Sequence, residues 1–220
     1  MKLVLASGSQ RRRELLTMCG YDYEIIVSNA DETIDENDPE SFVRALSFRK
    51  AKDVFDRLFA AGRRDFAVIG SDTVVAFQKD GETKPVIIGK PKDAKDAVRI
   101  LSMLSGKTHR VFTGVSVIAD IPDENAAAQC SIRKKAEIQT ECSITEVTFE
   151  TLSPDEITDY VNSGDPLDKA GSYGIQGPFG MFVREIRGNY FTVIGMPIPV
   201  LYKMLKKIGI LPHGFYERIE

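Results

Sequence analysis

Long hydrophobic segments are missing from this sequence, and cysteine is scarce. No segment approaches the length of a membrane span, and the apolar start at residues 3–6 is too short for the core of a signal peptide. The three cysteines, Cys19, Cys130 and Cys142, have wide spacings that fit neither a disulfide framework nor a CxxC zinc site. Reduced thiols are typical of the cytosol. These absences predict a cytoplasmic protein with no membrane partner.

A strong excess of either charge is also missing. The 29 basic and 32 acidic side chains leave a formal net charge of -3, whereas a general nucleic-acid binder normally carries a strongly basic surface. We therefore expect no nucleic-acid partner, only local recognition of phosphate, and a small molecule as the ligand. The 220 residues, 43% of them hydrophobic, suffice for one sizeable core, so we expect a single domain across residues 1–220.

The periodicity of apolar residues predicts an α/β protein with a mixed sheet. Expected strands cover residues 2–6, 23–27, 66–70, 74–77, 86–88, 108–119, 137–149, 181–186 and 190–193. Expected helices cover residues 11–19, a long segment after Pro39, and residues 94–104, 154–161 and 197–208. Two hairpins are predicted, one from residues 74–77 and 86–88 and one from the last two strands. Residues 120–135 lack periodicity and are predicted to be an extended surface connection.

One segment combines an apolar strand, a small hydroxyl-rich turn and a helix that starts with arginines. Residues 5–16 read LASGSQRRRELL. Cations in a first helical turn oppose the helix dipole, so these arginines need a nearby anion. A phosphate would accept hydrogen bonds from backbone N–H groups, from Ser7 and Ser9, and from guanidinium groups. A solvated basic patch with a serine as the helix N-cap is the alternative.

Two carboxylates and one lysine are candidates for chemistry. Asp72 is the best candidate for a general base, since it ends an apolar strand where exposure to water is limited. The alternative is that it caps a strand-end turn. Glu32 offers a hard oxygen donor for magnesium or manganese, with a solvated turn acid as the alternative. Lys50 lies at the edge of the apolar arc of the long helix, where it either enters a cleft or extends its ammonium to water.

Two later segments are candidates for ligand binding. Lys90 lies in a rigid turn between a glycine and a proline, which suits either a phosphate clamp or an ordinary surface turn. Residues 168–177 carry a glycine at every third position from 171, so that the backbone can approach a ligand while Lys169 adds a charge and Gln176 an amide. A flexible surface loop is the alternative. Residues 105–108 read SGKT but form no P-loop, because the earlier glycine is missing and the segment joins a helix to a strand.

Together these segments resemble the Maf family of nucleotide pyrophosphatases, from residue 2 to about residue 208. Four separated motifs carry the resemblance. They read LASGS with the following arginines and ELL within residues 5–16, GSDTVV at 70–75, GKP at 89–91 with LSGKTH at 104–109, and GDPLDKAGSYGIQG at 164–177. Chance agreement in this order is remote.

The resemblance implies an α/β fold with an elongated mixed β-sheet flanked by helices and two lobes around a central cleft, similar to inosine triphosphate pyrophosphatases. It also implies hydrolysis of a nucleoside triphosphate between the α and β phosphates, with Mg²⁺ or Mn²⁺ as cofactor. Matched by motif, Asp72 would activate the attacking water, and Glu32 with Asp72 would hold the metal. The residues implied to hold the phosphates are Ser7, Arg11, Arg12, Lys50, Lys90 and Lys169. A homodimer is left open.

The residue at position 176 favours pyrimidine triphosphates. The family's dTTP and UTP branch carries Tyr-x-Ile-Gln-Gly, as residues 173–177 do here, whereas a branch that acts on 7-methyl-GTP has a glutamate in place of Gln176. A glutamine amide both donates to O4 and accepts from N3–H of uracil or thymine. Arg11, Thr73 and Gln176 match the positions that the family uses for substrate choice. Modified pyrimidine nucleotides are further candidate substrates.

Three features depart from the family pattern. Gln10 replaces a proline, residues 178–179 replace a more glycine-rich continuation, and the connection at residues 120–135 is longer than usual. Arg13 lies outside the matching arginine pair, so we expect it to be solvated.

Two other functions remain as alternatives. One is a nucleotide-binding regulator of cell division, suggested by the link of this family to septum formation, and the other is a pyrophosphatase of inosine or xanthosine triphosphate. The presence of Asp72, Glu32 and Lys90 together favours an enzyme, because a regulator that only binds needs no water-activating acid. Gln176 gives no support to a purine substrate.

Overall fold

A computed structural model describes residues 1–79, 81–121 and 136–214. The described strands form one mixed seven-stranded sheet of order β2-β1-β3-β5-β6-β7, in which β4 pairs with β3 off this path. The strands are β1 (Lys2–Leu5), β2 (Glu24–Ile25), β3 (Phe66–Phe77), β4 (Val86–Ile88), β5 (Thr108–Asp120), β6 (Glu137–Phe149) and β7 (Val183–Arg187). Most of the predicted connection at residues 120–135, with Cys130, lies outside the described residues.

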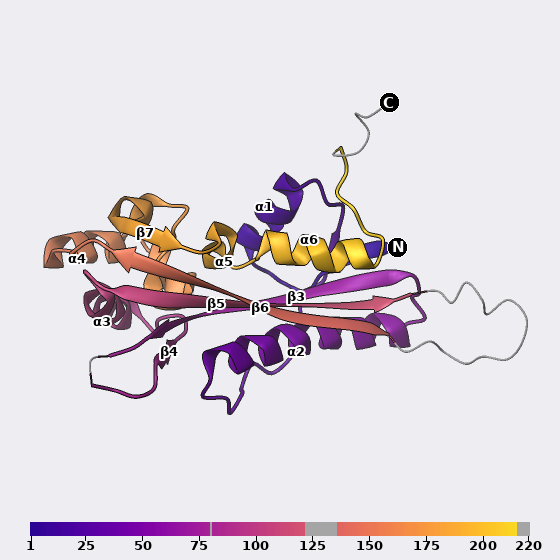
Figure 1. Cartoon of the computed structure of the whole chain (residues 1–220), viewed down its shortest axis with the longest axis horizontal. Coiled ribbons are helices and arrows are strands. Elements are labelled where there is room, and N and C mark those ends of the chain that lie inside the picture. Colours follow the sequence, from indigo (N-terminus) through magenta and orange to yellow (C-terminus); the bar gives the residue numbers. More distant parts are fainter. Residues whose placement is uncertain (80, 122–135, 215–220) are drawn as a thin grey trace, which may run out of the picture.

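Helices cover both faces of this elongated, twisted sheet (Figure 1). The long helix α2 lies on one face, α1, α5 and α6 lie on the other, and α3 and α4 lie at one end (Figure 1). Their bounds are α1 (Gln10–Met18), α2 (Pro39–Ala60), α3 (Ala94–Leu104), α4 (Pro154–Asn162), α5 (Tyr190–Ile194) and α6 (Ile198–Lys207), with 3₁₀ turns η1 (Asp165–Asp168), η2 (Ala170–Ser172) and η3 (Pro178–Phe182). The predicted mixed α/β fold is confirmed.

Strand β3 changes its neighbour halfway along one edge. Its residues 66–69 pair in parallel with β1, and its residues 75–77 pair with the antiparallel β4. Its other edge pairs with β5 from residue 66 to residue 76. Among the described strands, none pairs with residues 70–74 on the edge that β1 and β4 share. This gap opens where the carboxyl end of β1 points, which is the place where α/β sheets bind ligands.

The apolar cores lie on either side of this gap. The first half of β3 packs into two of them, one on each face of the sheet, through residues such as Phe66, Val68 and Ile69. The second half contributes Val75 and Phe77 to a core shared with α3, α4 and the glycine-rich segment. Val74 and Ala76 pack with Val43 and Phe112 in a smaller core on the α2 side. The two lobes that the resemblance implies stay a prediction.

Two glycines let α2 lie directly on the sheet. A Cβ atom at Gly70 would lie 2.2 Å from the carbonyl oxygen of Ser47, and one at Gly114 would lie 2.2 Å from the carbonyl oxygen of Val43. No real side chain tolerates such distances, so only glycine fits at both positions. The contact fixes the height of α2 over β3 and β5.

Two predicted elements are wrong. Residues 66–77 form one strand, whereas we expected a break at residues 71–73; unbroken pairing with β5 and tertiary hydrogen bonds of the polar side chains keep the strand continuous. Residues 190–194 form the short helix α5, whereas we expected residues 190–193 to form a strand in a hairpin with residues 181–186. That hairpin does not form, because β7 pairs with β6. Asn189 caps this helix by accepting from the Phe191 N–H, and Gly195 ends it with a positive φ of 111°.

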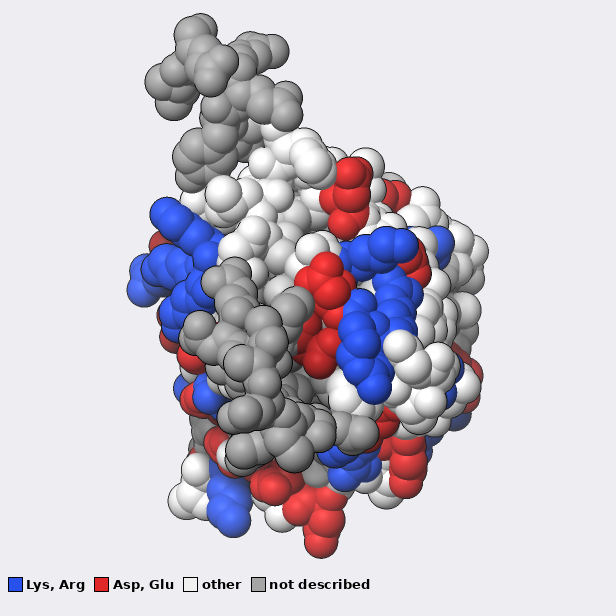
Figure 2. Space-filling view, turned by 90° about the vertical axis from the view of Figure 1, so that its right-hand side faces the viewer, with Lys and Arg blue, Asp and Glu red and all other residues white. Residues whose placement is uncertain are grey.

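The surface shows no large area of one charge on the side that Figure 2 presents. Acidic and basic side chains lie interspersed there (Figure 2), as expected from a net charge of -3. The described residues contain no candidate for a membrane-spanning helix.

The tight contact of α2 gives a stability prediction. We expect Gly70→Ala to lower the free energy of unfolding by about 3 kcal/mol, because the new methyl group meets the Ser47 carbonyl and the Ala51 N–H, which are backbone atoms. Gly89→Ala is the matched control, since a Cβ there meets nothing within 4 Å. Chemical denaturation measures both variants, and equal stabilities would contradict the proposed close contact.

Candidate active site

The predicted site residues gather around the gap at residues 70–74 of β3. Side chains alternate along this strand, so Gly70 and Asp72 face α2 while Ser71 and Thr73 face the other side of the sheet. Asp72 lies in the middle of β3, which corrects our expectation that it ends a strand. Its limited exposure comes from α2 above it, and the residue is 8% exposed.

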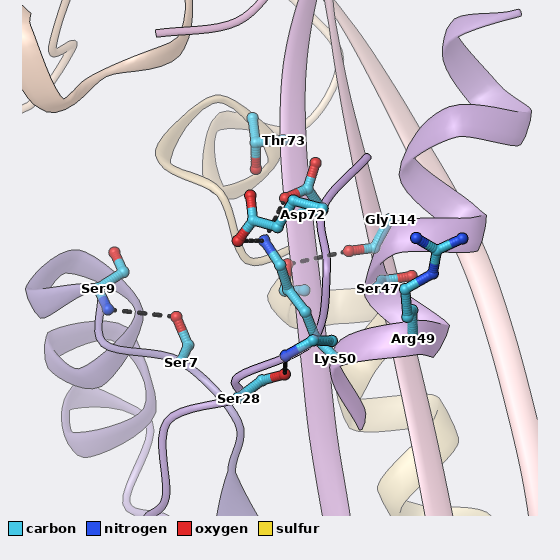
Figure 3. Close-up of polar contacts among 12 residues, drawn as sticks. Ser7, Ser9, Ser28, Ser47, Arg49, Lys50, Asp72, Thr73 and Gly114 are labelled. Carbon is cyan, nitrogen blue, oxygen red and sulfur yellow. Dashed lines mark hydrogen bonds and ion pairs between the residues drawn. The ribbon is translucent and has the colours of Figure 1, made fainter. Parts of the chain in front are cut away.

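Lys50 joins the two predicted metal-binding carboxylates. Its Nζ donates to Asp72 Oδ1 at 2.7 Å and lies 3.0 Å from Glu32 Oε1. Figure 3 shows the Lys50 side chain pointing from α2 to the Asp72 carboxylate. The side chains of Lys50 and Asp72 are each 12% exposed, whereas that of Glu32 is 66% exposed. Lys50 therefore enters the gap, and its role as a surface side chain is excluded.

The same carboxylates fit a divalent cation. Asp72 and Glu32 come from segments far apart in sequence, yet their oxygens converge on one cationic nitrogen. Carboxylate oxygens are ligands that Mg²⁺ and Mn²⁺ prefer, and Mg²⁺ commonly takes one or two of them together with substrate phosphates. No group of three or more metal-ligating side chains occurs among the described residues. A cation at this place would thus need ligands from the substrate and from water.

Arg12 reaches the gap from the opposite face of the sheet. Its Nε donates to the Gly195 carbonyl at 2.8 Å, its Nη1 to Ser7 Oγ at 3.2 Å, and its Nη2 to Thr73 Oγ1 at 3.2 Å. All three partners are uncharged. Burial lowers the pKa of Arg12, and the nearby Asp72 carboxylate partly opposes that effect. A partly buried guanidinium held by neutral acceptors attracts an anionic ligand.

The first turn of α1 is also prepared for an anion. Ser9 is the N-cap residue, but its side chain makes no cap hydrogen bond, and no acidic residue lies in the first turn. The Ser7 hydroxyl is buried and instead accepts from the Ser9 N–H at 3.2 Å. We expected the Arg13 side chain to be solvated, but it is only partly exposed. Its Nη2 donates to the Gly8 carbonyl at 3.0 Å, and its Nε is buried.

Lys169 binds the carboxylates of its own loop. Its Nζ lies 3.0 Å from Asp165 Oδ1 and 2.7 Å from Asp168 Oδ1, and its side chain is 12% exposed. Asp168 also faces Arg11, with Nη1 and Oδ2 3.7 Å apart. The predicted phosphate ligands Arg11 and Lys169 therefore share one exposed carboxylate, which connects the start of α1 to the glycine-rich segment.

Lys90 and Gln176 lie on two turns that meet beside β3. The Gly171 N–H donates to the Gly89 carbonyl at 3.0 Å, so the turn after β4 and the glycine-rich segment are joined. Gly171 has a φ of 73°, and a Cβ there would lie 2.6 Å from the Val75 side chain. Both Lys90 and Gln176 are exposed. Neither side chain forms a hydrogen bond or ion pair with a residue in the described parts of the chain, so both are available to a ligand.

Sequence reasoning missed the hydroxyl groups that support Arg12 and Thr73. Ser71 Oγ lies 2.9 Å from the carbonyl oxygens of both Gly114 and Gly195, which share its one hydroxyl proton, and the second of these carbonyls is the one that binds Arg12. Thr73 Oγ1 lies 3.0 Å from Thr113 Oγ1. The only signal in the sequence was the presence of hydroxyl residues in otherwise apolar strands.

A buried histidine anchors the glycine-rich segment. His109 Nε2 lies 3.0 Å from Tyr173 Oη, and both rings pack edge-on against Phe149. Burial lowers the pKa of His109 to about 3 and raises the pKa of Tyr173. The pair is therefore neutral at physiological pH, and it anchors the segment that carries Gln176.

Known proteins resemble this chain over nearly all of its length. Residues 2–208 match the family model described as Maf-like protein. A dTTP/UTP pyrophosphatase of Agathobacter rectalis is 39% identical over 217 residues, which cover 95% of this chain and 98% of that protein. A dTTP/UTP pyrophosphatase of Bacillus thuringiensis subsp. konkukian is 42% identical over 210 residues, which cover 95% of this chain and 96% of that protein. The structure of the Staphylococcus aureus Ham1 protein matches with a TM-score of 0.48 and 14% identity, covering 94% of this chain and 99% of that one.

The buried histidine makes stability depend on pH. In the unfolded chain His109 has its ordinary pKa of 6.5, so it gains a proton as the pH falls through this value. In the folded chain its pKa is about 3, so it gains the proton only at a much lower pH. The unfolded state therefore binds more protons in this window, and stability falls as the pH falls. Between pH 6.5 and pH 5 we expect the wild-type chain to lose about 2 kcal/mol more than His109→Gln. Urea unfolding at both pH values measures this difference; parallel losses would show that His109 is not buried in the neutral form.

Proposed function

The chain belongs to the Maf family, and we propose that it hydrolyses dTTP and UTP to the nucleoside monophosphate and pyrophosphate. The names of its relatives support this substrate class. The observation that carries the proposal is the placement of Asp72, a nearly buried carboxylate in a gap of the sheet that also holds Lys50, Glu32 and Arg12.

Asp72 would act as the general base toward water. Lys50 donates to its Oδ1 at 2.7 Å and so fixes the orientation of the carboxylate. In the described part of the chain Oδ2 has no hydrogen-bond partner, so it can orient a water molecule. A general base must lie within hydrogen-bond reach of the water that attacks, and the gap gives that water access from the open edge of β3.

The phosphates would be held by cationic groups around the same gap. Arg12 and Ser7, with the N–H groups of the first turn of α1, surround one position for a phosphate. Arg11 and Lys169 would release Asp168 and bind phosphate oxygens in its place, since the shared carboxylate is exposed. Lys90 would approach from the turn after β4. Together these charges would stabilise the negative charge that develops on the phosphoryl oxygens.

Glu32 and Asp72 would hold a divalent cation together with the triphosphate. A bound Mg²⁺ or Mn²⁺ would supply charge stabilisation to the phosphates. Lys50 bridges these two carboxylates. In the complex its ammonium would bind phosphate oxygens, which is the role that the family resemblance implies.

Gln176 would select the base. Its exposed amide lies on the turn of residues 174–177, where the Gly177 N–H donates to the Gly174 carbonyl at 3.2 Å. The amide can donate to O4 of uracil or thymine, whereas adenine carries an amino group, itself a donor, at the matching position. The aromatic contacts of Tyr173 fix the start of this turn.

A panel of nucleoside triphosphates tests the reaction. We expect the purified chain with Mg²⁺ or Mn²⁺ to release pyrophosphate from dTTP and UTP at least tenfold faster than from ATP. Asp72→Asn should lower kcat by about 10² to 10⁴, the usual contribution of a general base. Asp56→Asn is the matched control, because Asp56 lies exposed on α2 in an ion pair with Lys52. Equal rates for all nucleotides, or full activity of Asp72→Asn, would contradict the proposal.

The cation site gives a separate prediction. We expect a chelator to abolish pyrophosphate release, and Glu32→Gln to raise the Mg²⁺ concentration for half-maximal activity about tenfold or more, because one anionic ligand is lost. Glu36→Gln, four residues away and exposed, is the control and should leave this concentration unchanged. Activity that persists in excess chelator would rule out the cofactor.

A further inference from the structure

A line of hydroxyl groups crosses the sheet behind the gap. Thr73 on β3 lies opposite Thr113 on β5, and their Oγ1 atoms are 3.0 Å apart. Thr113 Oγ1 is fully buried and donates to the carbonyl oxygen of Thr192 at 2.7 Å. On the other side, Arg12 Nη2 donates to Thr73 Oγ1 at 3.2 Å.

The ends of this line fix the direction of every hydrogen bond in it. A carbonyl oxygen can only accept, so the single proton of the Thr113 hydroxyl is committed to Thr192. Thr113 must then accept from Thr73, whose single proton is committed in turn. A guanidinium can only donate, so Arg12 uses one of the acceptor positions of Thr73 Oγ1. Hydrogen bonds that point one way along a line also strengthen one another.

Thr73 therefore has no proton to offer to a ligand. Its Oγ1 has a second acceptor position, and Thr73 is partly exposed at the gap. Ionised phosphate oxygens are acceptors as well, so Thr73 cannot bind them by a hydrogen bond. A ligand group that meets Thr73 must be a donor, such as the N3–H of uracil or thymine, or a sugar hydroxyl.

We propose that Thr113 is a positioning residue for base selection, which holds the Thr73 hydroxyl as a fixed acceptor for the N3–H group of a pyrimidine. This inference rests on the proposed function. Cytosine carries an unprotonated N3 at the same position. This nitrogen is an acceptor that would face the Thr73 oxygen, also an acceptor, so no hydrogen bond forms and the contact is unfavourable. Both dTTP and UTP carry N3–H, while they differ at the sugar 2′ position.

Removal of the Thr113 hydroxyl tests the inference. In Thr113→Val the shape is kept but the Thr73 proton loses its acceptor, so the Thr73 hydroxyl can turn and donate to N3 of cytosine. We expect the ratio of kcat/KM for UTP to that for CTP to fall about tenfold, the worth of one net hydrogen bond. Because both substrates are measured on one preparation, the ratio does not depend on the fraction of folded protein.

Three further variants separate this role from a structural one. Thr113→Ser keeps the hydroxyl and should keep the ratio. Ser143→Ala removes a neighbouring hydroxyl that contacts Thr192 Oγ1, 2.7 Å away, and not the Thr192 carbonyl, so it should also keep the ratio. The thiol of Thr113→Cys is a weak hydrogen-bond donor, so this variant should also lower the UTP to CTP ratio. It replaces Thr113→Val in the test if Thr113→Val does not fold.

A double-mutant cycle gives the decisive comparison. In a Thr73→Val background, Thr113→Val should change the UTP to CTP ratio no further, because the hydroxyl that it orients is absent. An unchanged ratio in Thr113→Val and Thr113→Cys, or an equal loss of kcat/KM on both substrates, would overturn the inference, and the second result would point to a sugar contact. A wild-type chain that does not hydrolyse UTP would instead count against the proposed function.

Discussion

The close packing of α2 against the sheet determines where the charged groups of the site can lie. Because Gly70 and Gly114 carry no side chain, the backbone of α2 rests on β3 and β5. One turn further along α2, Lys50 then reaches Asp72, the next residue of β3 on the same face. A larger residue at either glycine would lift the helix and draw the ammonium away from the carboxylate. The Lys50–Asp72 pair is thus a consequence of backbone contact.

The gap in the edge of β3 explains why polar groups can lie at the centre of an apolar sheet. Asp72 and Thr73 belong to a strand that is apolar over most of its length, but the edge beside them is not paired with β1 or β4. A buried ion pair costs desolvation, which good geometry and access to solvent or ligand reduce. The positive charge of Arg12 is not balanced by its direct partners, since all three are neutral. An anionic substrate would balance this charge.

The sequence predicted most of the fold, because local patterns determine it, and it named side chains that the structure brings together around the gap. The alternation of apolar residues located α3 and β6 correctly, and the motifs named Ser7, Arg12, Lys50 and Asp72. It failed where tertiary contacts decide. The continuity of β3 depends on its pairing with β5, and α5 depends on Asn189 and Gly195 at its ends. The contacts of Thr113 with Thr73 and Thr192, and of Arg11 with Asp168, likewise join segments that no local pattern connects.

We propose that catalysis takes place in the gap of β3, between Asp72 on one face and Arg12 on the other. A crystal structure with Mg²⁺ and a UTP analogue that carries a non-hydrolysable α,β bridge is the decisive test. We expect the α phosphate beside Asp72, the cation on Glu32 and Asp72, Lys50 turned to the phosphates, the uracil N3–H on Thr73 and its O4 on Gln176. A nucleotide bound with its α phosphate away from residues 70–74 would rule this out.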